Sequence, residues 1–126
     1  MISNQWEGKT FLVVEDDHVS LEFIKELFEP YKVKFICSYN GREAVEICRQ
    51  NSAIDLVLMD IQLPVLNGID AMRQIKEIYP DLPVIAQTAF AMSGDRERYE
   101  NDGFDAYISK PINISELLLL IERLIF

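Results

Sequence analysis

Basic residues, cysteines, histidines and long apolar runs are all scarce in this chain of 126 residues. Lys and Arg number 12 against 21 Asp and Glu, so the formal net charge is −9, and the basic residues form no cluster. Because most faces of such a protein would repel a polyanion, the composition argues against direct binding of nucleic acid or of an anionic membrane. The longest apolar run, 117–121, is far shorter than the roughly 20 residues of a membrane span, so we expect no membrane contact.

The two cysteines, Cys37 and Cys48, lack the spacing of a metal motif or of a secreted disulfide scaffold. We therefore expect two buried thiols in a reducing, cytoplasmic setting. The stretch 1–10 has no basic segment leading into an apolar one and does not resemble a signal peptide. With 49% apolar residues, we expect a single domain over 1–126 whose core spans about 9–126, after an N-terminal lead-in over 1–8.

Short apolar runs of two kinds predict five β-strands. Nearly continuous runs are typical of strands buried on both faces of a parallel sheet. Four such runs cover 11–14, 54 with 56–59, 84–86 and 106–108. The fifth segment, 33–39, alternates between apolar and polar residues, which favours a strand at the edge of the sheet.

Segments with a helical spacing of apolar residues separate these strands. The first three stripes are Phe23, Ile24, Leu27 and Phe28; then Ala44, Val45, Ile47 and Cys48; then Ile69, Met72, Ile75 and Tyr79. Pro30 and Pro80 stop the first and the third. The fourth segment, 93–102, has only Tyr99 as a large apolar residue, so we expect a weakly held helix closed by Gly103.

The last helix begins at Asn113, with Glu116 as the partner of a capping box. Its residues Leu119 and Phe126 point away from the apolar stripe, which favours a docking surface there. Five strands that alternate with five helices predict an α/β fold, a three-layer sandwich with right-handed crossovers. The alternation alone does not give the strand order.

Polar side chains follow the predicted strands at the edge where open α/β sheets bind ligands. They are Glu15, Asp16 and Asp17 after the first strand, Asp60 after the third, Thr88 after the fourth and Lys110 after the fifth. Carboxylates about 4 Å apart repel by roughly 4 kcal/mol at an effective dielectric constant near 20, so a cation is expected among them. Few oxygen ligands favour Mg²⁺. Asp17 is interpreted as an acid that stabilises the start of the first helix.

Four segments together resemble the signature of receiver domains of response regulators in two-component phosphorelay systems. The segments are VVEDD (13–17), LMDIQLPVLNG (58–68), AQTAFA (86–91) and YISKP (107–111). The resemblance runs from Lys9 to about Leu124 and is greatest to the receiver domain of a hybrid sensor histidine kinase. It implies the flavodoxin-like receiver fold, with five helices around a five-stranded parallel sheet of order 2-1-3-4-5.

The resemblance also implies a role for each strand-end residue. Asp60 would be the phosphoacceptor and, with Asp16, a ligand of Mg²⁺. Glu15 would act on the metal through water, and Gln62 would supply its backbone carbonyl. Many receivers have Asp where this chain has Glu15, so the arm of the first acid is longer here.

Other positions would hold the phosphoryl group or respond to it. Thr88 would hydrogen-bond it, Lys110 would pair with it, and the peptide bond before Pro111 would be cis. Tyr107 matches the switch aromatic. Phe90 is equally consistent with simple packing and with a gate that controls the access of water.

The resemblance implies a signalling domain rather than an enzyme. It would accept a phosphoryl group from the phosphohistidine of a histidine kinase or a histidine phosphotransfer domain. It would then switch the face formed by the fourth helix, fifth strand and fifth helix, which is expected to dock a partner or form a homodimer.

Three alternatives fit the residues less well. A haloacid-dehalogenase-type phosphatase needs a second Asp where Gln62 stands, and a flavodoxin-like FMN carrier needs a phosphate loop where Glu15 and Asp16 would repel the phosphate. A degenerate receiver that only docks partners would not need Asp60, Thr88 and Lys110 intact.

Overall fold

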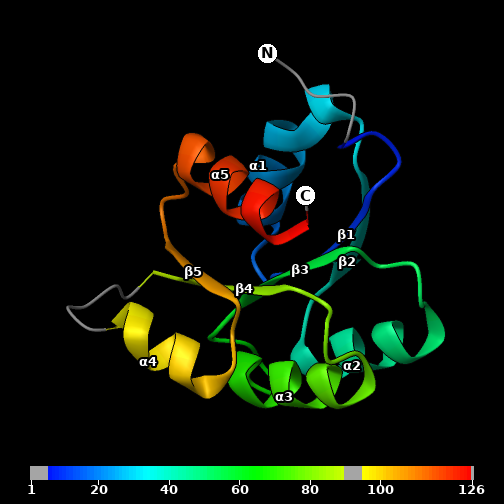
Figure 1. Ribbon diagram of the computed structural model, residues 1–126, viewed down its shortest axis with the longest axis vertical. Helices are drawn as coiled ribbons and strands as arrows, with labels where there is room; N and C mark the ends of the chain where they lie inside the picture. The colour runs from blue at the N-terminus through cyan, green and yellow to red at the C-terminus, as the bar shows by residue number, and fades with distance from the viewer. Residues whose placement is uncertain (1–5, 90–94, 126) are drawn as a thin grey trace.

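Five parallel β-strands in the order β2-β1-β3-β4-β5 form the centre of the computed structural model, which describes residues 6–89 and 95–125 (Figure 1). The strands are β1 (Thr10–Val14), β2 (Lys34–Ser38), β3 (Leu56–Asp60), β4 (Val84–Thr88) and β5 (Ala106–Ser109). Every neighbouring pair is parallel. The predicted strand order is therefore confirmed.

Within the described residues, five α-helices cover the two faces of this sheet. They are α1 (His18–Phe28), α2 (Gly41–Gln50), α3 (Gly68–Ile78), α4 (Asp95–Asp102) and α5 (Ile114–Ile125), with a short 3-10 helix, η2 (Glu29–Tyr31), after α1. Helices α1 and α5 lie on one face, and α2, α3 and α4 lie on the other (Figure 1). Each face buries its own apolar cluster, which confirms the three-layer sandwich.

The interior strands β1, β3 and β4 are buried along almost their whole length, as their apolar runs predict. Strand β2 lies at an edge, as predicted, and most of its side chains are only partly buried, but it is shorter at both ends than 33–39. Strand β4 continues past the predicted 84–86 through Gln87 and Thr88. Both residues are buried although they are polar, so the apolar run ends before the strand does.

Trp6 belongs to the core, although the sequence assigns 1–8 to a lead-in. Its buried ring lies 5.3 Å from the ring of Tyr31 and 6.1 Å from the rings of Phe11 and Phe28, between centroids. Such aromatic contacts stabilise a core beyond the burial of apolar area. The core therefore extends toward the N-terminus as far as Trp6.

Helix α1 buries Ile24 and Phe28 of the predicted stripe, but Leu21 takes the place of Phe23. Leu21, Ile24 and Phe28 are buried, whereas Phe23 is 46% exposed. Positions three, four and seven apart share one helix face, and at about 100° per residue Phe23 points away from the face that these three form. The predicted stripes of α2 and α3 are confirmed at their buried positions, which are Ala44, Val45 and Cys48 in α2 and Met72 and Ile75 in α3.

Helix α4 is attached to the sheet through its C-terminal end. The backbone N–H groups of Gly103 and Phe104 donate to the carbonyls of Glu100 and Tyr99, and Gly103 has a φ of 122°. This pattern is a Schellman motif, and the rings of Tyr99 and Phe104 make its apolar contact at 6.1 Å. The predicted closing role of Gly103 is confirmed. The described part of α4 runs from Asp95 to Asp102; the predicted start at residue 93, Phe90 and Phe126 lie outside the described residues.

Helix α5 begins as predicted. The side chain of Asn113 accepts a hydrogen bond from the backbone N–H of Glu116 at 3.1 Å, and Leu117 and Ile121 are buried against the sheet. Leu119 is exposed, as predicted. Among the residues that the structure describes, no helix has the length and apolar composition that crossing a membrane requires.

A polar bracket fastens the amino ends of β4 and β5 to α3. The ammonium of Lys76 lies 2.6 Å from Oδ2 of Asp105 and donates to the carbonyl of Leu82 at 2.7 Å. The same Asp105 oxygen accepts from the backbone N–H of Val84. This bracket lies at the end of the sheet opposite to the acidic residues.

Candidate functional site

The parallel register brings the carboxyl ends of β1, β3 and β4 to the same edge of the sheet. Val14 pairs with Met59, and Asp60 pairs with Gln87 on the next strand. Glu15 follows β1 directly and extends the pairing, because its backbone N–H donates to the carbonyl of Ser38. The strand ends therefore converge as the sequence predicts.

Three of the predicted metal ligands lie together at this edge. Glu15, Asp16 and Asp60 each offer a carboxylate oxygen, and these oxygens all lie within 4.8 Å of one another. Glu15 and Asp60 are buried, whereas Asp16 is exposed. The cluster is therefore open to solvent on the side of Asp16 and closed on the side of the other two carboxylates.

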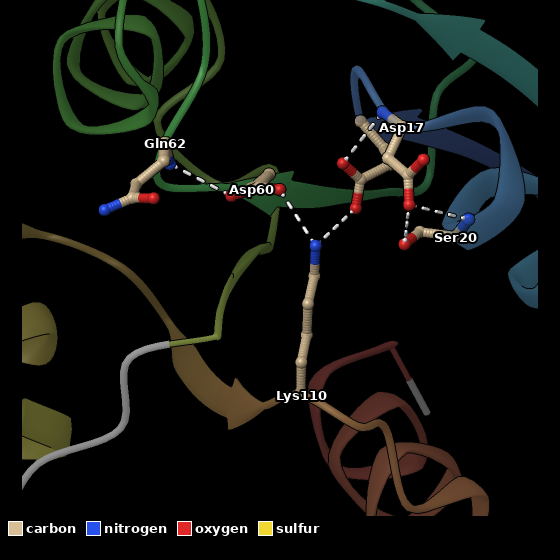
Figure 2. A network of polar contacts seen from close by, with 6 residues as sticks. Asp17, Ser20, Asp60, Gln62 and Lys110 are labelled. Carbon is tan, nitrogen blue, oxygen red and sulfur yellow. Dashed lines mark hydrogen bonds and ion pairs between the residues drawn. The ribbon is translucent and has the colours of Figure 1, made fainter.

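Lys110 approaches the carboxylate cluster from the side of β5. Its side chain extends from the end of β5 toward Asp60 (Figure 2), and its ammonium lies 3.0 Å from Oδ2 of Asp60 and 2.6 Å from Oε1 of Glu15. The backbone N–H of Lys110 donates to the carbonyl of Thr88 at 2.8 Å, which fixes the start of this connection. The peptide bond between Lys110 and Pro111 is cis.

Burial and charge act against each other in this group. Burial raises the pKa of Glu15 to about 7; the hydrogen bond from Lys110 lowers it, and the negative charge of Asp60 raises it. Burial also disfavours the charged form of Lys110, but the hydrogen bonds to Glu15 and Asp60 outweigh it and raise the pKa of Lys110. The site therefore keeps its lysine charged, while burial favours the protonated form of Glu15.

Asp60 is held at both of its oxygens. Oδ2 contacts Lys110, and Oδ1 accepts a hydrogen bond from the backbone N–H of Gln62 at 2.9 Å (Figure 2). The connection after β3 also packs closely on Asp60, because a Cβ atom at Gly68 would lie 2.3 Å from the Asp60 carbonyl oxygen. Gly68 ends the segment LMDIQLPVLNG, but this packing role is not predicted from the sequence. The one indication of it is that Gly68 follows Asn67, whose side chain caps α3.

Asp17 does not join the cluster. Its Oδ2 accepts hydrogen bonds from the backbone N–H of Ser20 at 3.3 Å and from the Ser20 hydroxyl at 2.7 Å. This is the N-cap of α1, which agrees with the interpretation of Asp17 as a helix-start acid. The backbone N–H of Asp17 donates to Oε2 of Glu15, so the cap also orients that carboxylate.

Thr88 and Tyr107 lie on the neighbouring strands β4 and β5. Thr88 is buried at the end of β4, beside the cluster in the sheet. The ring of Tyr107 is also buried and stacks on the ring of Tyr99 from α4, with centroids 5.3 Å apart and planes at 25°. The predicted gate residue Phe90 lies outside the described residues.

Comparisons with known proteins agree with this geometry. Residues 11–122 match the family described as Response regulator receiver domain. Among curated relatives, the polar-differentiation response regulator DivK of Brucella anthropi is 39% identical over 112 residues, which cover 87% of this chain and 90% of DivK.

Two solved structures extend the comparison. The receiver domain of sensor histidine kinase PA1611 from Pseudomonas aeruginosa PAO1 has a magnesium ion coordinated in its active site cleft; it is 33% identical, covers 94% of this chain and 98% of its own, and has a TM-score of 0.84. A chain from the Saccharomyces cerevisiae co-crystal of the histidine phosphotransfer protein Ypd1 and the receiver domain of Ssk1 is 26% identical, with 95% and 90% coverage and a TM-score of 0.84. The chain therefore belongs to the response regulator receiver domain family, whose members are phosphoacceptor signalling domains and not catalytic enzymes.

Proposed function

We propose that Asp60 is the residue that accepts the phosphoryl group, and that its donor is a phosphohistidine of a histidine kinase or a histidine phosphotransfer domain. The observation that carries this proposal is the environment of Asp60. It lies at the carboxyl end of the central strand β3, where its Oδ2 contacts the Lys110 ammonium and its Oδ1 accepts from the backbone N–H of Gln62. A carboxylate fixed beside a cation is positioned to attack a phosphorus atom whose negative charge that cation also attracts.

The transfer exchanges one phosphorus bond for another. A carboxylate oxygen of Asp60 attacks phosphorus, a P–O bond forms, and the P–N bond to the donor histidine breaks with its electron pair returning to the imidazole nitrogen. Lys110 remains paired with the phosphoryl charge through the transfer. Phosphoryl transfer needs mostly positioning and charge stabilisation, and the rigid strand ends supply the positioning.

The donor set of the site fits Mg²⁺. Its ligands would be Asp16 directly, Glu15 through water, Asp60, and the backbone carbonyl of Gln62. The raised pKa of Glu15 fits this assignment, because burial raises it most and the negative charge of Asp60 raises it further, and a bound cation would offset both effects. When bound, Mg²⁺ would neutralise charge on the carboxylates and on the transferred phosphoryl group.

Phosphorylation changes the face formed by α4, β5 and α5. Thr88 would hydrogen-bond the phosphoryl group, and Tyr107 would respond as the switch aromatic, because it lies on the neighbouring strand and stacks on Tyr99 of α4. The exposed Leu119 on α5 adds apolar area to this face. A partner, or a second copy of the chain, would dock there once the population shifts.

The N-terminal segment and the segment 87–112 resemble the receiver of a hybrid sensor histidine kinase, and we assign the chain to that group. The curated relative DivK and the kinase receiver PA1611 both support membership of the wider family. The free thiols of Cys37 and Cys48 support a cytoplasmic location. The coding sequence that flanks this chain tests the assignment.

Labelling with a small phosphodonor tests the acceptor. Incubation with acetyl phosphate and Mg²⁺ is expected to add one phosphoryl group that hydroxylamine removes, and Asp60→Asn is expected to abolish it. Asp17→Asn is the matched control, because Asp17 caps α1 and should leave labelling intact. Equal labelling of Asp60→Asn and the parent protein would contradict the proposal.

A further inference from the structure

Gln87 carries a buried amide that has no hydrogen-bond partner. The side chain is 0% exposed, and within the described part of the chain neither its Oε1 nor its Nε2 is paired. Both atoms have almost no accessible surface, so water does not reach them. A buried donor and a buried acceptor that stay unpaired cost free energy, because in the unfolded chain both are hydrogen-bonded to water. Gln87 therefore destabilises the unphosphorylated state that the structure shows.

The amide lies beside the residue that accepts the phosphoryl group. Gln87 is in register with Asp60 on β3 and with Ile108 on β5. Paired residues of neighbouring parallel strands point to the same face of the sheet, so the Gln87 and Asp60 side chains lie on one face. Ile85, two residues earlier on that face, belongs to the apolar cluster between the sheet and the helices α1 and α5. Gln87 is thus a polar residue between this cluster and the site.

A cavity of about 280 Å³ borders Gln87 on the side of α1. Its other lining residues come from α1 and from the connection between β5 and α5; they are Val19, Ser20, Phe23, Ile24, Lys110, Pro111 and Ile112. Val19 is 78% exposed, so the cavity reaches the surface there. Because the amide atoms have almost no accessible surface, only the carbon chain of Gln87 borders the cavity. Rotation of this side chain, with a shift of the wall, would bring the amide into contact with water.

A phosphoryl group on Asp60 displaces one wall of this cavity. Lys110 belongs to the wall, and its ammonium lies 3.0 Å from Oδ2 of Asp60. A phosphorus atom with three further oxygens does not fit within that contact, so the lysine has to shift while it stays paired with the new charge. Pro111 and Ile112 follow Lys110 directly and line the same cavity, so its shift is passed on to them.

We propose that Gln87 destabilises the unphosphorylated state selectively and thereby favours the phosphorylated state. This inference rests on the proposed role of Asp60. When Lys110 and Ile112 shift, the amide turns into the cavity and forms hydrogen bonds with water. A group that destabilises only one of two states shifts the equilibrium toward the other by the same free energy. Gln87 acts in this way without touching the phosphoryl group.

Replacement of the amide by a methionine side chain tests this inference. Gln87→Met keeps the length of the side chain and removes both unpaired atoms. Without a ligand, the variant is expected to be more stable than the parent protein in denaturant unfolding. It is also expected to bind beryllofluoride, which imitates the phosphoryl group, about tenfold more weakly in the presence of Mg²⁺, which corresponds to about 1.4 kcal/mol. A titration followed by amide NMR of the ¹⁵N-labelled chain measures this affinity.

Ile85→Met is the matched control. Ile85 is also fully buried on β4 and points to the same face as Gln87. The substitution conserves volume and removes no polar group, so it should give no gain in stability. Its affinity for beryllofluoride should equal that of the parent protein.

A second measurement uses the parent protein alone. The side-chain NH₂ group of Gln87 is expected to exchange slowly with water in the free protein and roughly tenfold faster or more with beryllofluoride bound. Equal protection of this group in both states would overturn the inference and leave the role of Asp60 standing. Either no gain in stability or an unchanged beryllofluoride affinity in Gln87→Met would do the same. A parent protein that does not bind beryllofluoride would overturn the proposed function as well.

Discussion

Lys110 lies closer to Glu15 than to Asp60: its ammonium is 2.6 Å from the Glu15 carboxylate and 3.0 Å from the Asp60 carboxylate. The longer arm of Glu15, where many receivers have Asp, thus reaches the lysine. This ion pair ties the end of β1 to the end of β5, and these two strands are not neighbours in the sheet.

The first prediction concerns pH. The folded state raises the pKa of Glu15 from its ordinary value of 4.5 to about 7, so its contribution to stability is complete below about 4.5 and is lost as the pH rises through about 7. At about 1.4 kcal/mol per pKa unit, the loss is at most roughly 3 kcal/mol. Glu15→Gln is expected to remove this loss, so its advantage over the parent protein grows between pH 4.5 and pH 7.

Denaturant unfolding in the presence of EDTA measures this difference at each pH. Glu46→Gln is the control, because Glu46 is exposed on α2 and should change the stability little at any pH. An advantage of Glu15→Gln that is the same at pH 4.5 and pH 8 would show that charge on Glu15 is not its cause.

The second prediction concerns the metal. Asp16 is exposed, so Asp16→Asn relieves little repulsion and is expected to change the metal-free stability by less than about 1 kcal/mol. Mg²⁺ is expected to stabilise the parent protein in proportion to the logarithm of its concentration, and this gain should vanish in Asp16→Asn. Thermal unfolding at several Mg²⁺ concentrations measures both effects. If the unfolding temperature of the parent protein did not change with the Mg²⁺ concentration, the magnesium assignment would have no basis.

The third prediction concerns the connection after β3. A Cβ atom at Gly68 would lie 2.3 Å from the backbone carbonyl oxygen of Asp60, so Gly68→Ala must move the backbone of the acceptor. We expect a loss of stability of more than about 2 kcal/mol and a large loss of labelling by acetyl phosphate. In Gly8→Ala the new Cβ has open space but a φ of 83°, so the expected loss is about 1 kcal/mol with normal labelling. Similar behaviour of the two variants would contradict the packing argument.

The fourth prediction concerns the α4, β5 and α5 face. Beryllofluoride with Mg²⁺, which imitates the phosphoryl group, is expected to slow amide hydrogen exchange in α4 and around Tyr107 more than in α2. Tyr107→Leu loses the stacking on Tyr99, so it should weaken this response and leave labelling of Asp60 largely intact. Equal protection of α2 and α4 would place the response elsewhere.

The sequence predicts the convergence of Glu15, Asp60 and Lys110 because parallel strands end at one edge, and their order in the chain then places each residue. It does not show that Glu15 is buried while Asp16 is exposed, since both simply follow an apolar run. That difference depends on which way each side chain points at the end of β1.

Phe23, Trp6 and Gln87 show where the pattern fails. Phe23 is apolar and exposed, Trp6 precedes the first strand and is buried, and Gln87 is polar and buried. The burial or exposure of each side chain depends on contacts between elements that lie far apart in the chain. The predicted strand ends at Ala86 because Gln87 is polar. A buried amide without partners is rare, and no local pattern in the sequence signals it.

The two ends of β5 are held by different kinds of contact, because the bracket of Lys76, Asp105 and Val84 lies at its amino end only. Its amino end is held by the ion pair of Asp105 with Lys76 and by the hydrogen bond that the Asp105 carboxylate accepts from the backbone N–H of Val84. Its carboxyl end leads into Lys110, which contacts the carboxylates of the site. A change in charge at Asp60 therefore acts on the carboxyl end of β5 through Lys110, while the ion pair holds the amino end. Tyr107 lies between the two ends and stacks on Tyr99, so a shift at the carboxyl end would be passed to α4.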